Sequence, residues 1–172
     1  MSGSSSVAID MKFKINALLD APIRSDMIKW RVSRAYVTGK NPIAMVFPYV
    51  KSQACREILN RAVGVTGWQV EYTEPMSGGV CCRIGIWDGS AWIWKEDAGG
   101  MKSSMPDKGD QIKSGYSDAF KRTCRAWGIG DSLSLVGEII VPLYSSPKKS
   151  KTEQRHKEKG KAGGQDTVWY WE

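Results

Sequence analysis

Histidine is almost missing from this chain of 172 residues, and its scarcity removes several classes of catalyst. The only histidine, His156, lies in a polar, lysine-rich stretch near the C-terminus. A Ser-His-Asp triad or a histidine metal site therefore has no histidine to use elsewhere in the chain. No GxxxxGK[ST] phosphate loop is present either, so ATP-driven chemistry finds no support. We expect a protein that is not an enzyme and needs no cofactor or metal.

Cysteine and long apolar runs are also scarce. The four cysteines stand at positions 55, 81, 82 and 124 and form no CxxC pair, which argues against a zinc site and a disulfide framework. We interpret them as reduced, buried thiols. No apolar run approaches the roughly 18 residues of a membrane span, and the N-terminus lacks the apolar core of a secretory signal. These absences predict an intracellular protein without membrane contact.

What the sequence has in quantity is positive charge and tryptophan. The net charge is +7, eight residues are tryptophan, and 41% are hydrophobic, enough for one domain with a real core. The basic surplus is not confined to the C-terminal stretch, where residues 145–172 hold seven Lys or Arg against four Asp or Glu. The charge favours an anionic partner such as nucleic acid.

The hydrophobic patterns predict an α+β fold. They indicate a hairpin, a helix, three successive strands, a long helix and a last β-segment, at 30–50, 52–64, 67–100, 107–127 and 135–143 respectively. A short helix is expected to begin at Ala21. We divide the chain into four parts: a flexible N-terminus, one folded domain, a disordered basic linker and an aromatic-acidic tip, at 1–20, 21–144, 145–164 and 165–172.

The long helix raises the sharpest functional question. Lys121, Arg122 and Arg125 fall on the arc opposite its apolar residues, with Asp118 among them. A solvated surface with an Asp–Arg pair is the favoured interpretation of the charge pattern alone. The same three cations on a helix fixed by its packing would also grip phosphates. The pattern by itself leaves both interpretations open.

Aromatic residues gather around the Asp88-Gly89 turn. We expect Trp87, Trp92 and Trp94 to fill the core between sheet and helix, the alternative being a stacking platform for bases. Arg31, Arg34 and Lys40 decorate the first hairpin, where each could be plain surface. A basic hairpin facing a basic helix would outline a groove.

The order of the motifs carries a family resemblance. A helix that ends in glycine leads to GW at 67–68, then CRIGIWDG at 82–89, KEDAGG at 95–100 and KSGYSDAFKRTCRAWG at 113–128. Over about residues 25–135 this series resembles the N-terminal domain of the eukaryotic Rad-type single-strand annealing recombinases and their phage relatives, the Sak-like annealing proteins. The block SDAFKRTCRAWG resembles the family's helix signature.

The resemblance implies a β-β-β-α core, with an additional hairpin and helices, that assembles side by side into a ring or arc. A positively charged groove between hairpin and helix would hold single-stranded DNA. Lys121, Arg122 and Arg125 would then bind the DNA backbone, with Arg34, Arg31 and Lys102 as further candidates. The implied activity is ATP-independent binding and annealing of complementary strands in homologous recombination and repair.

Two alternatives and one unplaced segment remain. The chain could be a single-stranded nucleic-acid-binding module that does not anneal, or a metal-dependent nuclease using Asp88, Glu96 and Asp97. The sequence DTVWYWE at 166–172 could dock a host replication or repair protein, fold back onto a basic groove as a strand mimic, or be an inert end. The compact size and this tail suggest a phage source, hence the cytoplasm of a bacterial host.

Overall fold

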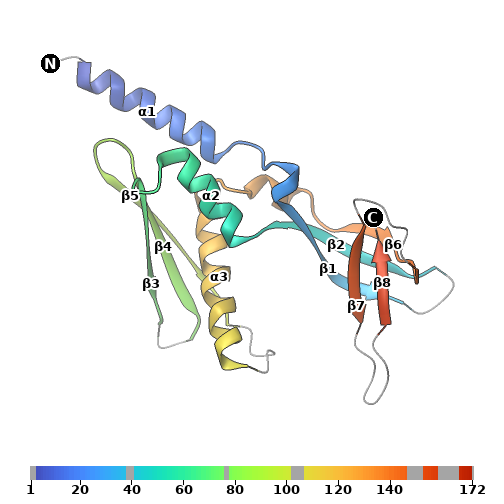
Figure 1. Cartoon of the computed structure of the whole chain (residues 1–172). Coiled ribbons are helices and arrows are strands. Elements are labelled where there is room, and N and C mark those ends of the chain that lie inside the picture. The colour runs from blue at the N-terminus through green and yellow to red at the C-terminus, as the bar shows by residue number, and fades with distance from the viewer. Residues whose placement is uncertain are drawn as a thin grey trace. The chain divides into compact units, whose positions relative to one another are not determined.

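The computed structural model describes residues 3–37, 41–75, 78–101, 107–146, 153–158 and 167–171. The chain divides into two compact units (Figure 1): unit 1 comprises Met1–Ile28 and Val50–Ser132, and unit 2 comprises Lys29–Tyr49 and Leu133–Glu172. The architecture is α+β, as predicted. The β-β-β-α core belongs to unit 1, whereas the first hairpin belongs to unit 2.

Unit 1 holds three α-helices and one three-stranded sheet among the residues described. The helices are α1 (Gly3–Leu19), α2 (Ser52–Val63) and α3 (Lys108–Ala126). The sheet has the order β3-β4-β5 with antiparallel neighbours, and its strands are β3 (Trp68–Thr73), β4 (Val80–Trp87) and β5 (Trp92–Gly99). The predicted helix, three strands and long helix are therefore confirmed. None of the described helices has the length and apolar character needed to cross a membrane.

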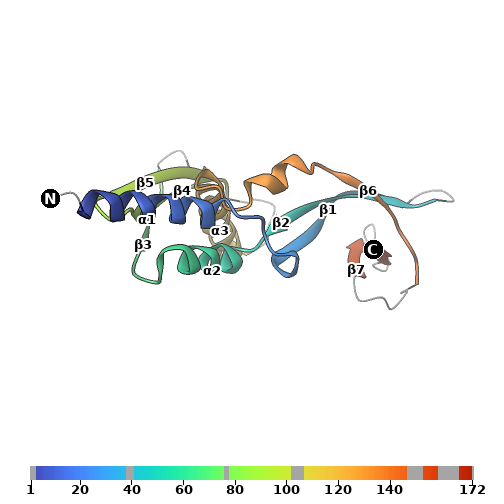
Figure 2. The same ribbon diagram turned by 90° about the horizontal axis from the view of Figure 1, so that it is seen from above.

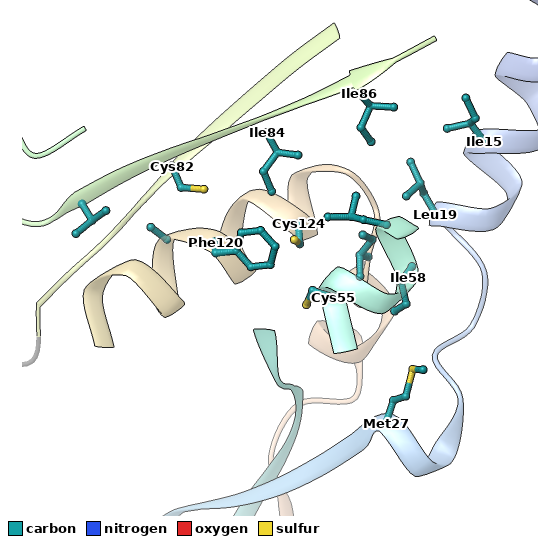
Figure 3. Packing of buried hydrophobic residues seen from close by; sticks show 14 residues of the cluster. Ile15, Leu19, Met27, Cys55, Ile58, Cys82, Ile84, Ile86, Phe120 and Cys124 are labelled. Atoms are coloured by element: carbon teal, nitrogen blue, oxygen red, sulfur yellow. The ribbon is translucent and has the colours of Figure 1, made fainter. Parts of the chain in front are cut away.

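The central strand β4 explains how unit 1 closes. Its alternate residues Val80, Cys82, Ile84 and Ile86 are buried on one face, as period-two alternation requires. Figure 3 shows Cys82, Ile84 and Ile86 directed toward the helices, where Phe120 and Cys124 of α3 lie next to Cys55 and Ile58 of α2. Figure 2 shows α1 and α2 beside this sheet and α3, with which they form unit 1. The helices thus cover one sheet face only.

Three of the four thiols lie inside this core, as expected. Cys55, Cys82 and Cys124 are buried, and Cys81 is half-buried. Burial raises the pKa of the Cys124 thiol far above its usual range and also raises the pKa of Cys82. A hydrogen bond with Cys124 lowers the pKa of Cys55. The thiols act here as small core residues that pack α2 and β4 against α3.

Helix α3 approaches β5 so closely that one glycine is required. A Cβ placed on Gly99 would lie 2.4 Å from the backbone nitrogen of Ala119. Gly115 on the helix is similarly confined, since its Cβ would lie 3.2 Å from Cγ2 of Val80. Gly99 of the KEDAGG motif therefore serves helix packing.

We expect Gly99→Ala to destabilise the protein by about 1–3 kcal/mol, because the backbone of α3 must move away from the sheet. The matched control is Gly100→Ala, whose Cβ would meet no atom within 4 Å. Chemical denaturation of both variants measures the difference. Equal unfolding midpoints would show that the close approach does not hold the helix.

The N-terminal 20 residues correct our expectation of a flexible segment. Residues 3–19 form α1, in which Ile15 and Leu19 are buried against the unit 1 core. Nζ of Lys12 lies 2.8 Å from the carboxylate of Asp88, which holds the pKa of Asp88 well below its usual range. The helix expected from Ala21 is also corrected: only a 3-10 turn, η1 (Ser25–Met27), forms there. The small polar residues at the start of the sequence concealed the contacts that apolar residues farther along α1 make with the core.

The tryptophans around the Asp88-Gly89 turn correct a second expectation. Trp87, Trp92 and Trp94 lie on the sheet face opposite the buried residues of β4, since Trp87 pairs with Trp92 and Gly85 with Trp94. Trp87 and Trp92 keep 41% and 37% of their surface exposed. They therefore do not fill the space between sheet and α3, which the aliphatic side chains of β4 already occupy.

Unit 2 is a second sheet covered by a hairpin. Its sheet has the order β1-β2-β6, with strands β1 (Ile28–Tyr36), β2 (Ile43–Val50) and β6 (Ile139–Pro142). A 3-10 helix, η2 (Asp131–Leu135), precedes β6. The predicted first hairpin and the last β-segment are confirmed. Ala44 and Val46 of β2 and Val141 of β6 are buried on one face of this sheet.

The C-terminal stretch corrects a third expectation, because the described part of it is folded. Strands β7 (Gln154–Glu158) and β8 (Thr167–Trp171) pair antiparallel within the segments assigned to a disordered linker and a free tip. Trp171 is 4% exposed and meets Trp30 of β1 edge-on, with ring centroids 6.4 Å apart. The tryptophans supply the apolar contacts that the polar composition of this stretch concealed.

Candidate nucleic-acid interface

Helix α3 ends where β5 supplies a cation to its last carbonyls. Nζ of Lys95 donates to the carbonyl oxygen of Ala126 at 2.8 Å and lies 4.8 Å from the ring centroid of Trp127. Gly128 follows with a φ of +94°, a conformation that glycine adopts without strain. A cation at the negative end of the helix dipole also favours this end point. The end of α3 at Ala126 is thus supported by contacts with the sheet.

Two further bonds fix α3 to the central strand. The buried Thr123 hydroxyl lies 2.9 Å from the carbonyl oxygens of both Cys82 and Ala119, and can donate to either. The indole nitrogen of Trp127 donates to the carbonyl oxygen of Ile84 at 3.2 Å. Because these contacts engage one side of the helix, the positions of the side chains on its other side are determined by the sheet.

Arg122, one of the three predicted cations, faces β5 and has a partner. Its Nε donates to Oδ1 of Asp97 at 3.1 Å, and its side chain remains 52% exposed. An exposed pair of this kind adds at most about 1 kcal/mol of stability. The favoured charge-pattern interpretation, an Asp–Arg pair on a solvated face, therefore describes Arg122, although the acid is Asp97 and not Asp118.

Among the described residues, Lys121 and Arg125 are two cations left free in the last two turns of α3, as Lys108 is in its first turn. They lie four residues apart and so are neighbours on one face. Arg125 is exposed and Lys121 half-buried, and neither has a hydrogen bond or ion pair with another described residue. The interior of α3 therefore presents two adjacent, unneutralised cations to solvent.

A further cation near this face escaped the sequence analysis. The hydroxyl of Ser52 lies 2.7 Å from that of Ser117, so the first turn of α2 meets α3 one turn before Lys121. Lys51, which is exposed, is the N-cap residue immediately before α2. The sequence offers a signal for it, since Lys51 immediately precedes the helix predicted at 52–64.

Unit 2 carries the two arginines of the predicted hairpin. Along β1, the inward residues Trp30 and Val32 alternate with exposed residues. The alternation is interrupted at Ser33 and Arg34, which are consecutive and both exposed. Arg31 and Arg34 are therefore exposed on the same strand, together with Tyr36, which keeps 49% of its surface. Cations next to an exposed aromatic ring suit a nucleic-acid strand, which offers phosphates and base faces.

The remaining candidate residues either lie outside the described residues or do not come together. Lys102 and Lys40 lie outside the described residues. The three carboxylates of the nuclease alternative do not converge: Asp97 is bonded to Arg122, Asp88 to Lys12, and Glu96 lies on the opposite sheet face beside Arg83. Across the described ranges, no three His, Cys, Asp or Glu side chains come together as a possible metal site.

Comparison with protein families identifies the chain. The family model described as "Rad52/22 family double-strand break repair protein" matches residues 12–162. The chain belongs to the Rad52/Rad22 family. No curated protein matches it. The resemblance stated from the motifs is thereby confirmed, and membership places the protein in a family of double-strand break repair proteins.

The limits of the Rad52/Rad22 match bear on the candidate residues. All six sequence-predicted positions, from Arg31 to Arg125, lie inside the matched range. Strand β8 lies beyond it, so the aromatic strand that packs Trp171 into unit 2 is outside the part that identifies the family. Roles inherited from the family can therefore concern α3 and the hairpin, whereas β8 must be interpreted from its own contacts.

Proposed function

We propose that this chain is a non-enzymatic protein that binds single-stranded DNA and anneals complementary strands without ATP during recombination and repair. Family membership supports a role in double-strand break repair. The observation that carries the proposal is the pair Lys121 and Arg125, two unneutralised neighbours on a helix that Thr123, Trp127 and Lys95 attach to the sheet. Arg31 and Arg34 are the hairpin's contribution, and Arg122 adds a half-exposed guanidinium.

The physical mechanism needs no covalent step. Complementary strands repel one another through their phosphates, and cations that contact those phosphates release counterions and reduce the repulsion. If the protein holds the backbone, the bases remain free to test a partner. Each matched base step then contributes about 1.4 kcal/mol of stacking, so a short match is enough to hold the product. We propose that several copies act together in a ring, which multiplies weak contacts through effective concentration.

An annealing assay with two complementary, fluorescently labelled oligonucleotides tests this function. The protein should accelerate pairing in the absence of ATP and in the presence of EDTA, and the acceleration should decline with salt. A protein that binds the single strands but leaves the pairing rate unchanged would be the non-annealing module. Cleavage of a labelled strand with Mg²⁺ or Mn²⁺ would instead favour the nuclease.

A further inference from the structure

The outer face of the unit 1 sheet carries an aromatic surface that the proposed function does not use. Its rings form a row, with centroids 5.8 Å apart between Trp87 and Trp92 and 6.3 Å between Trp92 and Trp94. Trp94 lies flat on β4, because a Cβ on Gly85 would come within 3.0 Å of its ring. The guanidinium of Arg83 lies 4.2 Å from the Trp94 centroid. These contacts fix the row while leaving two of its members exposed.

A hollow adjoins this row. It measures about 430 Å³ and is lined mainly by apolar groups, with a polar minority, from Ile15, Ala62, Val63, Thr66, Gly67, Trp87 and Trp92. Its size falls within the range of about 300–1,000 Å³ that binding pockets occupy. We call this hollow and its tryptophan rim the tryptophan hollow. An aromatic side chain with its neighbours would fit it.

Helix α1 offers such a group on its other side. Phe13 is 71% exposed and Ile9, one turn earlier, is 54% exposed. Phe13 is two residues from the buried Ile15, which places it about 200° around the helix and so on the outward face. A large apolar pair left in water on a folded helix marks an interaction surface. We call Ile9 and Phe13 the α1 knob.

Charge decides against nucleic acid as the occupant of the hollow. Arg83 of the outer face is opposed by Glu96, its direct cross-strand partner, and by Glu71 at 3.7 Å. Lys12 at the rim is already paired with Asp88. A phosphate backbone would therefore meet no surplus of cations here. The knob is flanked by Asp10 and Lys14, one charge of each sign, which can complement Arg83 and Glu96 across an interface.

We infer that the tryptophan hollow of one copy receives the α1 knob of a second copy, with Phe13 as the central anchor. This inference rests on the proposed function, which requires several copies to act together. Knob and hollow are different surfaces of one chain, so the contact is heterologous. Heterologous contacts join copies head to tail and close into a ring when the rotation permits. The aromatic pairing of Phe13 with Trp92 would supply the buried centre that such interfaces use.

The test uses the full chain with one surface damaged at a time. Phe13→Glu places a charge on the knob, and Trp92→Glu places one in the hollow. Each variant alone is expected to run as a monomer of 19.1 kDa by light scattering or mass photometry. Mixed in equal amounts, the two should form a complex of twice that mass and nothing larger, because only one intact knob and one intact hollow remain to meet.

Controls keep this test decisive. Ile112→Glu alters another exposed apolar residue, 45% exposed on α3, and should assemble like the unchanged chain. Circular dichroism checks the fold of each variant, and Trp87→Glu is the second hollow variant should Trp92→Glu unfold. Variants that assemble normally, or a mixture that stays monomeric, would overturn the contact. Loss of oligonucleotide binding with assembly intact would overturn it in favour of nucleobases in the hollow.

Measurements on the same samples distinguish a failure of this contact from a failure of the proposed function. Oligonucleotide binding and annealing by the unchanged chain test the function, whereas mass alone tests the contact. An unchanged chain that assembles through knob and hollow but ignores single strands would refute the function and keep the interface. A chain that anneals while the variants assemble normally would do the reverse.

Discussion

Replacing Lys121 and Arg125 together by alanine is expected to weaken binding of single-stranded DNA about 100-fold at low salt. Each lost contact between a charged group and a phosphate removes roughly 1.5 kcal/mol or more, and about 1.4 kcal/mol corresponds to a factor of ten. The slope of the logarithm of the binding constant against the logarithm of salt concentration should fall by about 1.4, since each single-strand contact contributes about 0.7. Fluorescence anisotropy over a salt series measures both quantities.

A control of equal charge makes this result specific. Lys108→Ala with Lys113→Ala removes two cations from the first turns of the same helix, where Lys113 is 3.5 Å from Asp110. These positions lie away from the free pair, so the control should change affinity several-fold at most. Arg122 is left in place because its removal would also release Asp97. Equal losses in both double variants would mean that net charge alone governs binding.

Trp171→Ala is expected to cost unit 2 about 3–5 kcal/mol of stability, the usual range for truncating a buried tryptophan. Trp171 belongs to a cluster with Ala44, Val46, Val141 and Leu143, and it makes an edge-on contact with Trp30. Its removal would leave these strand residues without cover. Chemical denaturation followed by near-ultraviolet circular dichroism, which reports on packed tryptophans, measures the loss.

Tyr36→Ala is the matched control, because this aromatic residue of the same unit is 49% exposed. Its substitution should shift the unfolding midpoint far less. An unchanged midpoint for Trp171→Ala would mean that β8 is not part of the unit 2 core. The tip would then be available as the docking segment that the sequence first suggested.

Elements were predictable from the sequence wherever the hydrophobic period and the residue types indicated the same structure. The alternation in β4 identified its buried face, and the long apolar arc of α3 identified both the helix and the exposed cations. The hairpin residues 30–50 were recognisable from two β-prone runs around a Gly-Lys-Asn-Pro turn. Local patterns of this kind depend on neighbours in the chain, which the sequence shows directly.

The sequence predictions were wrong where contacts between residues far apart in the chain, and not the local composition, determine the structure. Nothing near Trp87 shows that the aliphatic residues of β4 already fill the space under α3, which leaves the tryptophans outside. The polarity of residues 145–164 concealed a hairpin that depends on Trp30, more than a hundred residues away. The ion pair of Arg122 with Asp97 likewise joins a helix and a strand 25 residues apart. Propensity yields to such tertiary contacts.

Ser33 and Arg34 are consecutive residues of β1 and both are exposed, so the number of residues in this strand determines which side chains reach its surface. One extra residue between the inward Val32 and the inward Ala35 lets two arginines three positions apart point the same way. Strict alternation over the same residues would instead place the guanidinium of Arg34 on the inward face with Val32, where a lone charge among apolar residues has no counter-ion. In this strand, the electrostatic character of the surface is thus encoded by the residue count as much as by residue identity.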